Sequence, residues 1–226
     1  ALRLVVIAAG LVLMGVIMPV VYAAFGPSQA AAKLLQILLS AASCWLIYRI
    51  AGRTFDRTVA TVALAISAMY GMYLYFANEL LVVTLIVFLD LLGIDLLLRA
   101  SADGRRLLWG AAGAVFGLSA IARPTVLPFV AAACLWIIVS ARRSGKMAVA
   151  LRNCAVFALG VALPIAPIAL HNSMMDGDLV LISSSGGFNF YIGNNPQSDG
   201  VTAAAPGLRP DRGGAYSDQA RAAREA

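Results

Sequence analysis

The chain has 226 residues, of which 61% are hydrophobic and only 12% are charged, and its formal net charge is +6. Soluble domains carry about 25% charged residues, so this composition excludes an ordinary soluble protein and favours a membrane protein. The basic residues gather in connections between apolar stretches, which excludes the nucleic-acid interface that a net positive charge would suggest in a soluble domain.

Apolar stretches follow one another along most of the chain. A spanning helix needs about 20 residues, with a range of about 17–25, and each stretch approaches that length. The sequence therefore predicts an all-α polytopic membrane protein with a transmembrane bundle over residues 1–170 and an external segment over 171–226. The seven predicted spans cover residues 4–25, 34–48, 59–77, 80–98, 107–122, 126–140 and 154–170.

The connections between these stretches alternate in charge. Three of them, together with Arg3, hold 11 of the 17 basic residues. Loops on the cytoplasmic side carry an excess of Lys and Arg, so the connections at 49–57, 99–106 and 142–152 are predicted to face the cytoplasm. The N-terminus then lies inside and residues 171–226 lie outside the plasma (inner) membrane. Because the chain starts at Ala1 and stops within a helix-like run, we expect a piece of a longer protein.

Acidic residues in apolar stretches need a reason, because a charge at the centre of a spanning helix costs about 2.5–3.5 kcal/mol. Glu79 begins the fourth stretch at its outer end and is a candidate carboxylate of an external active site, with interfacial solvation as the alternative. Asp90 falls on nearly the same helical face, about 16 Å deeper, either protonated or paired inside the bundle. Asp95 precedes Arg99 by four residues, the spacing of a helical ion pair.

Two basic residues stand at outer ends, against the general trend of the charges. Arg123 lies in "GLSAIARPTVLPF", between the fifth and sixth stretches. Its guanidinium can bind phosphate with two hydrogen bonds, and a lipid phosphate would lie at this depth. Contact with ordinary lipid headgroups is the alternative. Lys33, at the outer start of the second stretch, has the same two interpretations. His171, after the last stretch, is a candidate ligand or base, or simply an interfacial residue.

Small residues in the apolar stretches have structural interpretations. Gly113 and Gly117, with Gly110 before them, form a stripe on one helix and predict close helix packing. The cysteines match no zinc or redox spacing and are interpreted as small core residues. They are Cys44, Cys134 and Cys154.

After the last stretch, "DLVLISSSGGFNFYIGNNP" predicts short extended segments around a Ser-Gly turn. The chain also contains "YFANELL" and "GLSAIARPTVLPF", and the run "FGPSQAAAKLLQILLSAASCWLIYRIAGRTFDR" near its start. Together these runs resemble the bacterial membrane glycosyltransferases of family 39, which are similar to dolichyl-phosphate-mannose protein mannosyltransferases and have the GT-C fold. The resemblance covers residues about 25–200, a partial GT-C fold.

The resemblance implies an enzyme that moves a sugar from a polyprenyl-phosphate donor to a lipid, glycan or protein acceptor on the external face. It implies that Arg123 contacts the lipid-linked phosphate and that Glu79 lines the cavity. The external segment would supply Tyr191 for the sugar face and Asn189 and Asn194 for sugar hydroxyls. It implies membrane lipids as partners and no nucleic acid. It makes no cofactor certain and leaves room for a divalent metal beside the phosphate.

Two departures from the family pattern bear on the site. The family's catalytic acid lies in the first external loop, and no external acid precedes Asp56 here, so we expect that acid upstream of Ala1. The family's Arg-Asn after the last of these spans is replaced by His171 and Asn172, which remain candidate substrate-binding residues. A transporter or flippase of a polar or lipid-linked solute is the alternative function, and a non-catalytic scaffold is a third.

Overall fold

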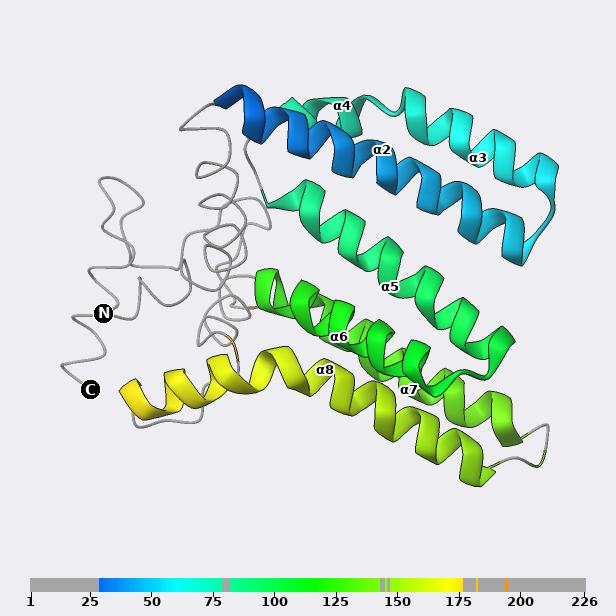
Figure 1. Cartoon of the computed structure of the whole chain (residues 1–226), viewed down its shortest axis with the longest axis vertical. Helices are drawn as coiled ribbons and strands as arrows, with labels where there is room; N and C mark the ends of the chain where they lie inside the picture. Colours follow the sequence, from blue (N-terminus) through cyan, green and yellow to red (C-terminus); the bar gives the residue numbers. More distant parts are fainter. Residues whose placement is uncertain are drawn as a thin grey trace. The chain divides into compact units, whose positions relative to one another are not determined.

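The computed structural model of the protein describes residues 29–78, 82–142, 145, 147–176, 182 and 194. Every secondary-structure element in that part is a helix, which agrees with the predicted all-α class (Figure 1). In chain order they are α2 (Gln29–Thr54), α3 (Arg57–Met69), α4 (Gly71–Asn78), α5 (Val83–Asp103), α6 (Arg106–Ala122), the short 3₁₀ helix η1 (Pro124–Val126), α7 (Leu127–Arg142) and α8 (Met147–Asp176).

The chain divides into two compact units, residues 1–182 and 183–226. All of the helices above belong to the first unit, and Asn194 is the described residue of the second. Helix α8 continues to Asp176, beyond the predicted end of the last span at residue 170. The division at residue 170 and the extended segments after residue 178 stay predictions, because most of that region lies outside the described residues.

The helices alternate in direction, except that α4 continues in the general direction of α3. Figure 1 shows the C-terminal ends of α2, α5 and α7 and the first turns of α3, α6 and α8 at one end of the bundle, here called the basic end because the three predicted basic connections join these helix ends. The passages α4–α5 and α6–α7 lie at the other end, here called the Arg123 end. The side of the membrane that each end faces stays a prediction.

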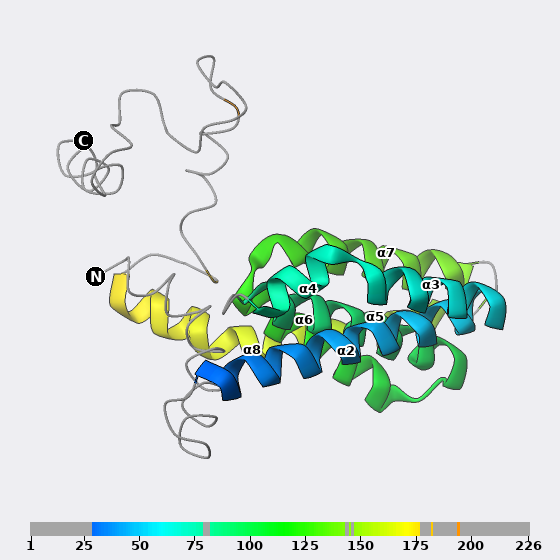
Figure 2. The ribbon, with the colours of Figure 1, turned by 90° about the horizontal axis from the view of Figure 1, so that it is seen from above.

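Neighbouring helices pack in a continuous series. Helix α2 contacts α3, α4 and α5, helix α6 contacts α5 and α8, and α7 contacts α8. Figure 2 shows these helices lying along one common direction when seen from above. The series places α5 and α6 at the centre, where side chains at their shared surface are shielded on both sides.

Local signals set several helix ends. Asp56 precedes α3 and its carboxylate accepts the Val59 N–H at 2.8 Å, which satisfies one of the free N–H groups of the first turn. Gly104 ends α5 in the left-handed conformation, φ 65°, which glycine adopts without strain. Arg123 ends α6 with an extended backbone, as expected for a residue before proline.

The stretch over 59–77, which was predicted as one span, is divided into two helices. Tyr70 has an extended backbone, φ −71° and ψ 109°, and separates α3 from α4. Its N–H donates to the Ser67 carbonyl at 3.3 Å, a contact three residues back that closes α3. Gly71 starts the next helix, and glycine favours such a break because its backbone is less restricted. Continuous apolar character hides this interruption in the sequence.

The apolar lengths of the described helices differ from the prediction of seven spans. Two helices, α2 and α8, are long and apolar enough to cross a membrane by length and composition. Three further apolar helices are shorter and cover Arg57–Met69, Arg106–Ala122 and Pro124–Ser140. The predicted span at 4–25 lies outside the described residues. Seven spans therefore stay a prediction, whereas the helical character of the other six stretches is confirmed.

Helices α6 and α8 approach each other closely, as the glycine stripe predicted. A Cβ on Gly113 would collide with the Phe157 carbonyl oxygen, and a Cβ on Gly160 would collide with the Gly110 carbonyl oxygen. Two prolines, Pro164 and Pro167, lie inside α8, which is visibly bent in Figure 1. Proline removes a helix hydrogen bond and is the usual cause of such a bend.

One buried carboxylate joins α2 to α5. Asp95 is completely buried, and the predicted ion pair with Arg99 is confirmed at 2.9 Å. Two arginines of α2 also reach it, Arg49 at 3.2 Å and Arg53 at 3.5 Å. Arg49 in turn lies over the Trp45 ring, 4.5 Å from its centre. The three arginines bring excess positive charge to the basic end.

Candidate functional site

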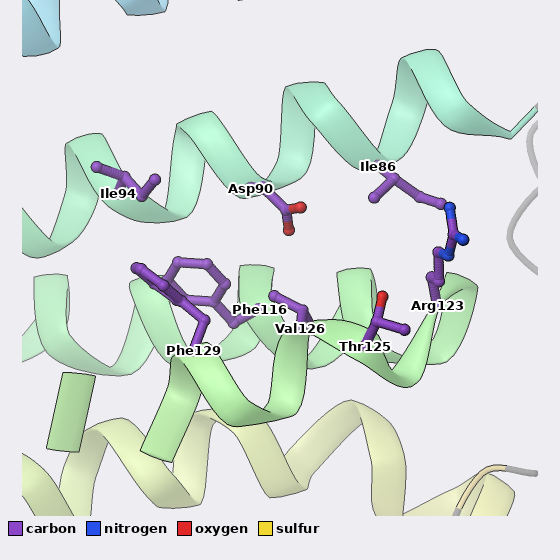
Figure 3. A pocket seen from close by; sticks show the side chains of 8 residues that line it. All are labelled: Ile86, Asp90, Ile94, Phe116, Arg123, Thr125, Val126 and Phe129. Carbon is purple, nitrogen blue, oxygen red and sulfur yellow. The ribbon is translucent and has the colours of Figure 1, made fainter. Parts of the chain in front are cut away.

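A cavity of about 270 Å³ opens at the Arg123 end, between α5, α6, η1 and the start of α7 (Figure 3). Its wall is mostly apolar but carries one carboxylate, one guanidinium and one hydroxyl. The lining residues are Ile86, Asp90, Ile94, Phe116, Arg123, Thr125, Val126 and Phe129. A largely apolar cavity with a few convergent polar groups is typical of a small-molecule site.

Arg123 stands at the mouth of this cavity because α6 ends there. Its N–H donates to the Ser119 carbonyl at 2.8 Å, and Pro124 begins η1 directly after it. The residue is exposed, and Figure 3 shows its side chain extending across to Ile86 of α5. The backbone thus fixes the base of the side chain, while the guanidinium keeps access to a ligand.

Asp90 faces the same cavity from the middle of α5 and is half-buried. The Ser119 hydroxyl donates to its Oδ1 at 2.5 Å, which ties α5 to α6 at this level. Figure 3 shows the carboxylate turned away from α5 toward the opposite wall, which carries Thr125 and Val126. Within the described residues, Asp90 and Arg123 line the same cavity but form no ion pair with each other.

Two aromatic rings form the deep end of the cavity. The Phe116 and Phe129 rings lie 5.2 Å apart between centroids with a tilt of 43°. Phe116 is fully buried, and it fits there because Gly93 has no side chain: a Cβ on Gly93 would lie 2.7 Å from the Phe116 ring. Phe129 is 43% exposed, so its ring is the aromatic surface that a ligand can reach.

The other predicted site residues are distributed elsewhere. Lys33 lies half-buried on α2 and His171 lies exposed on α8, and neither lines the cavity. Asn172 is only 1% exposed, and neither of its amide atoms has a hydrogen-bond partner in the described part of the chain. Asn194 is exposed and belongs to the second unit. Glu79, Asn189 and Tyr191 lie outside the described residues.

Sequence reasoning missed several residues of this site, among them the cavity residues Thr125 and Phe129 and the Asp90 partner Ser119. Thr125 and Phe129 stand two and six residues after Arg123, so the "ARPTVLPF" run contained them without distinguishing them from span residues. Ser119 precedes Arg123 by four residues, one helical turn, and that spacing was the available signal. Among the described residues, no group of three His, Cys, Asp or Glu side chains comes together, so the divalent metal that the resemblance allows has no ligand set there.

A family model for dolichyl-phosphate-mannose-protein mannosyltransferases matches residues 2–168. The chain belongs to this family. The match covers nearly three quarters of the sequence and contains both charged residues of the cavity, but it ends before His171. Comparisons with curated proteins and with solved structures gave no match.

Membership of the mannosyltransferase family gives a general activity. The family points to a membrane glycosyltransferase of mannosyltransferase type, with a lipid-linked sugar as donor in general. Family members are membrane proteins, which agrees with the two helices that could span a membrane. The cavity at the Arg123 end is therefore the candidate active-site region of the described bundle.

Proposed function

We propose that this chain is part of a glycosyltransferase that takes a sugar from a polyprenyl-phosphate-linked donor and passes it to a lipid, glycan or protein acceptor. The single observation that carries the proposal is the position of Arg123, exposed at the mouth of a cavity in an apolar bundle. A lipid-linked phosphate must lie where the bundle meets the membrane surface, and a guanidinium at that place suits it.

The proposed reaction is a direct displacement. A carboxylate removes the proton from the acceptor hydroxyl, whose oxygen attacks the anomeric carbon of the donor sugar. The bond between that carbon and the phosphate oxygen breaks, and the lipid phosphate leaves with the bonding electrons. Arg123 stabilises the negative charge that develops on the phosphate. Glu79 is the candidate base in this chain, and an acid upstream of Ala1 is the one that the family pattern favours.

We further propose that the Arg123 end faces the exterior of the plasma membrane. The basic end supports this orientation, because cytoplasmic loops carry an excess of Lys and Arg. The segment 171–226 is then external, and its Asn189, Tyr191 and Asn194 are proposed to contact the sugar. Lys33, His171 and Asn172 are proposed as secondary contacts of the lipid-linked substrate.

The substitution Arg123→Ala tests the proposal. We expect it to lower sugar transfer from a radiolabelled polyprenyl-phosphate hexose about 10- to 100-fold, since a hydrogen bond to a charged group is worth about 1.5–3 kcal/mol. Arg123→Lys should retain part of the activity, because lysine keeps the charge but loses the planar fork. The measurement is initial transfer rate in membranes that contain the full-length protein.

Arg106→Ala is the matched control for this experiment. Arg106 is an exposed arginine on the same helix, at its first residue, and therefore lies at the basic end. The Arg106→Ala variant should transfer sugar at the wild-type rate. Wild-type transfer by Arg123→Ala would remove Arg123 from the site. A wild-type protein that transfers neither mannose nor glucose from a polyprenyl phosphate would contradict the proposed function and favour the transporter alternative.

A further inference from the structure

We infer that Asp90 binds hydroxyl groups of the donor sugar and thereby helps to decide which sugar the cavity accepts. The inference rests on the proposed function, because it assigns the sugar-binding part of the same cavity. Its starting point is the pair of opposite charges, Asp90 and Arg123, that line one cavity without pairing with each other.

Asp90 and Asp95 both lie in the middle of α5, but they differ in the partners that compensate their charge. Asp95, five residues further along, is surrounded by three arginines. Asp90 has one hydroxyl partner in the described part of the chain, Ser119, and a face open to the cavity. An ionisable group in an apolar bundle is expensive and usually marks a functional position. Packing alone therefore does not account for a carboxylate here.

The relative depths of the two charges give the site a direction. Arg123 lines the cavity from the end of α6, and Asp90 lines it from α5, one helical turn beyond Ile86, so the two charges stand at different places on one wall (Figure 3). A phosphate is repelled by the carboxylate and attracted by the guanidinium, so a sugar phosphate would enter with its phosphate at Arg123 and its ring hydroxyls toward Asp90.

The chemistry of the wall suits a sugar ring. A carboxylate only accepts hydrogen bonds and has room for several, so Oδ1 and Oδ2 of Asp90 can take sugar O–H groups while Ser119 holds Oδ1 in place. Thr125 adds a hydroxyl on the opposite wall, and the accessible Phe129 ring offers a surface for the apolar face of the ring. Bonds to a charged acceptor are among the stronger hydrogen bonds, so their loss should be measurable.

The test combines a side-chain change with a change in the donor. Transfer is measured with the full-length protein, as wild type and as Asp90→Asn. The donors are polyprenyl-phosphate mannose and its monodeoxy analogues. If the wild type uses glucose instead of mannose, the donors are polyprenyl-phosphate glucose and its monodeoxy analogues. We expect one or two deoxy analogues to lose at least tenfold in kcat/KM with the wild type. With the parent donor, Asp90→Asn should have a kcat/KM that is lower than the wild-type value by a similar factor. With those same analogues, the kcat/KM of Asp90→Asn should fall little further.

Three controls keep the result specific. Asp103→Asn makes the same change at an exposed residue of α5, outside the cavity, and should match the wild type with every donor. Arg123→Ala should lower transfer of the parent donor and of the analogues by the same factor. Ser119→Ala keeps the Asp90 carboxylate but removes the hydrogen bond that holds it, and it should partly weaken the discrimination between the parent donor and its deoxy analogues. This variant serves as the test if Asp90→Asn does not fold.

The outcomes separate the two proposals. If the wild type transfers no lipid-linked hexose, the proposed function fails. If it transfers sugar and Asp90→Asn or Ser119→Ala leaves the sensitivity to every deoxy analogue unchanged, Asp90 does not contact the sugar and the inference is overturned. If the kcat/KM of the wild type is the same for every deoxy analogue, the inference is overturned as well, while the proposed function stands.

Discussion

Asp95→Asn is expected to lower the apparent unfolding temperature of the protein in detergent by roughly 5–10 °C. The reason is the cluster that this carboxylate holds together. Arg49 and Arg53 of α2 and Arg99 of α5 all lie within 3.5 Å of its oxygens, and the Asp95 side chain is completely buried. Removing the negative charge leaves three neighbouring positive charges with no counterion among them.

The expected magnitude follows from how deeply each partner is buried. Removing one partner of a fully buried pair costs about 3–5 kcal/mol. Here the arginine side chains are 18–39% exposed and can partly reach water or headgroups, so about 2–3 kcal/mol is expected. Neither Asp95 oxygen accepts a well-directed hydrogen bond in the described part of the chain, so the attraction is mainly between charges.

Asp103→Asn is the matched control for stability too, since Asp103 lies exposed on the same helix. It should unfold within about 1–2 °C of the wild type, because exposed substitutions usually change stability by less than 0.5 kcal/mol. Equal unfolding temperatures for the two variants would show that the arginines do not depend on Asp95 and that α2 is held on α5 by apolar contacts alone.

The same cluster shows what local spacing can and cannot reveal. The pair of Asp95 and Arg99 was predictable, because residues four apart share a helical face. Arg49 and Arg53 join it only because α2 packs on α5 at one particular register, and nothing in the spacing of either helix encodes that register. The bond between Ser119 and Asp90 was missed for the same reason.

The position of Arg123 beside the cavity was predictable because its signals are local. Proline after it ends α6, and a basic residue at the end of the bundle opposite the basic end departs from the general distribution of basic residues. Lys33 and His171 carried similar signals, yet neither lines the cavity. A position at the end of an apolar stretch predicts the depth of a side chain in the bundle, but the direction in which it points around the bundle depends on packing between helices.

The break at Tyr70 shows the opposite limit. Both α3 and α4 are apolar, so hydropathy predicted one helix where the structure has two. A glycine inside an apolar stretch is compatible with either outcome: Gly93 and Gly113 lie within helices and make room for a neighbour, whereas Gly71 begins a new helix. The space that surrounds each glycine distinguishes these cases, and only the structure supplies it.

That distinction leads to the second large effect. Gly113→Ala is expected to destabilise the protein by about 2–3 kcal/mol, near the upper end for overpacking. The new Cβ would collide with the Phe157 carbonyl oxygen and would lie 2.9 Å from the Val161 nitrogen and 3.0 Å from the Gly160 Cα. These are all backbone atoms of α8, so no side-chain rotation relieves the contact. Helices α6 and α8 must separate, which disturbs the core around Phe116 and Phe157.

Gly110→Ala, three residues earlier on the same helix, provides the comparison. A Cβ there would meet only the Val156 side chain, at an ordinary 3.6 Å. Both substitutions gain the same helix propensity, about 1 kcal/mol, so the difference between them isolates the contact with α8. We expect Gly110→Ala to unfold at or slightly above the wild-type temperature and Gly113→Ala well below it, as measured by thermal unfolding in the same detergent. Equal stability of the two variants would mean that the backbones of α6 and α8 do not touch at Gly113. Because α6 also carries Ser119 and ends at Arg123, separation of α6 from α8 should reduce sugar transfer by Gly113→Ala as well.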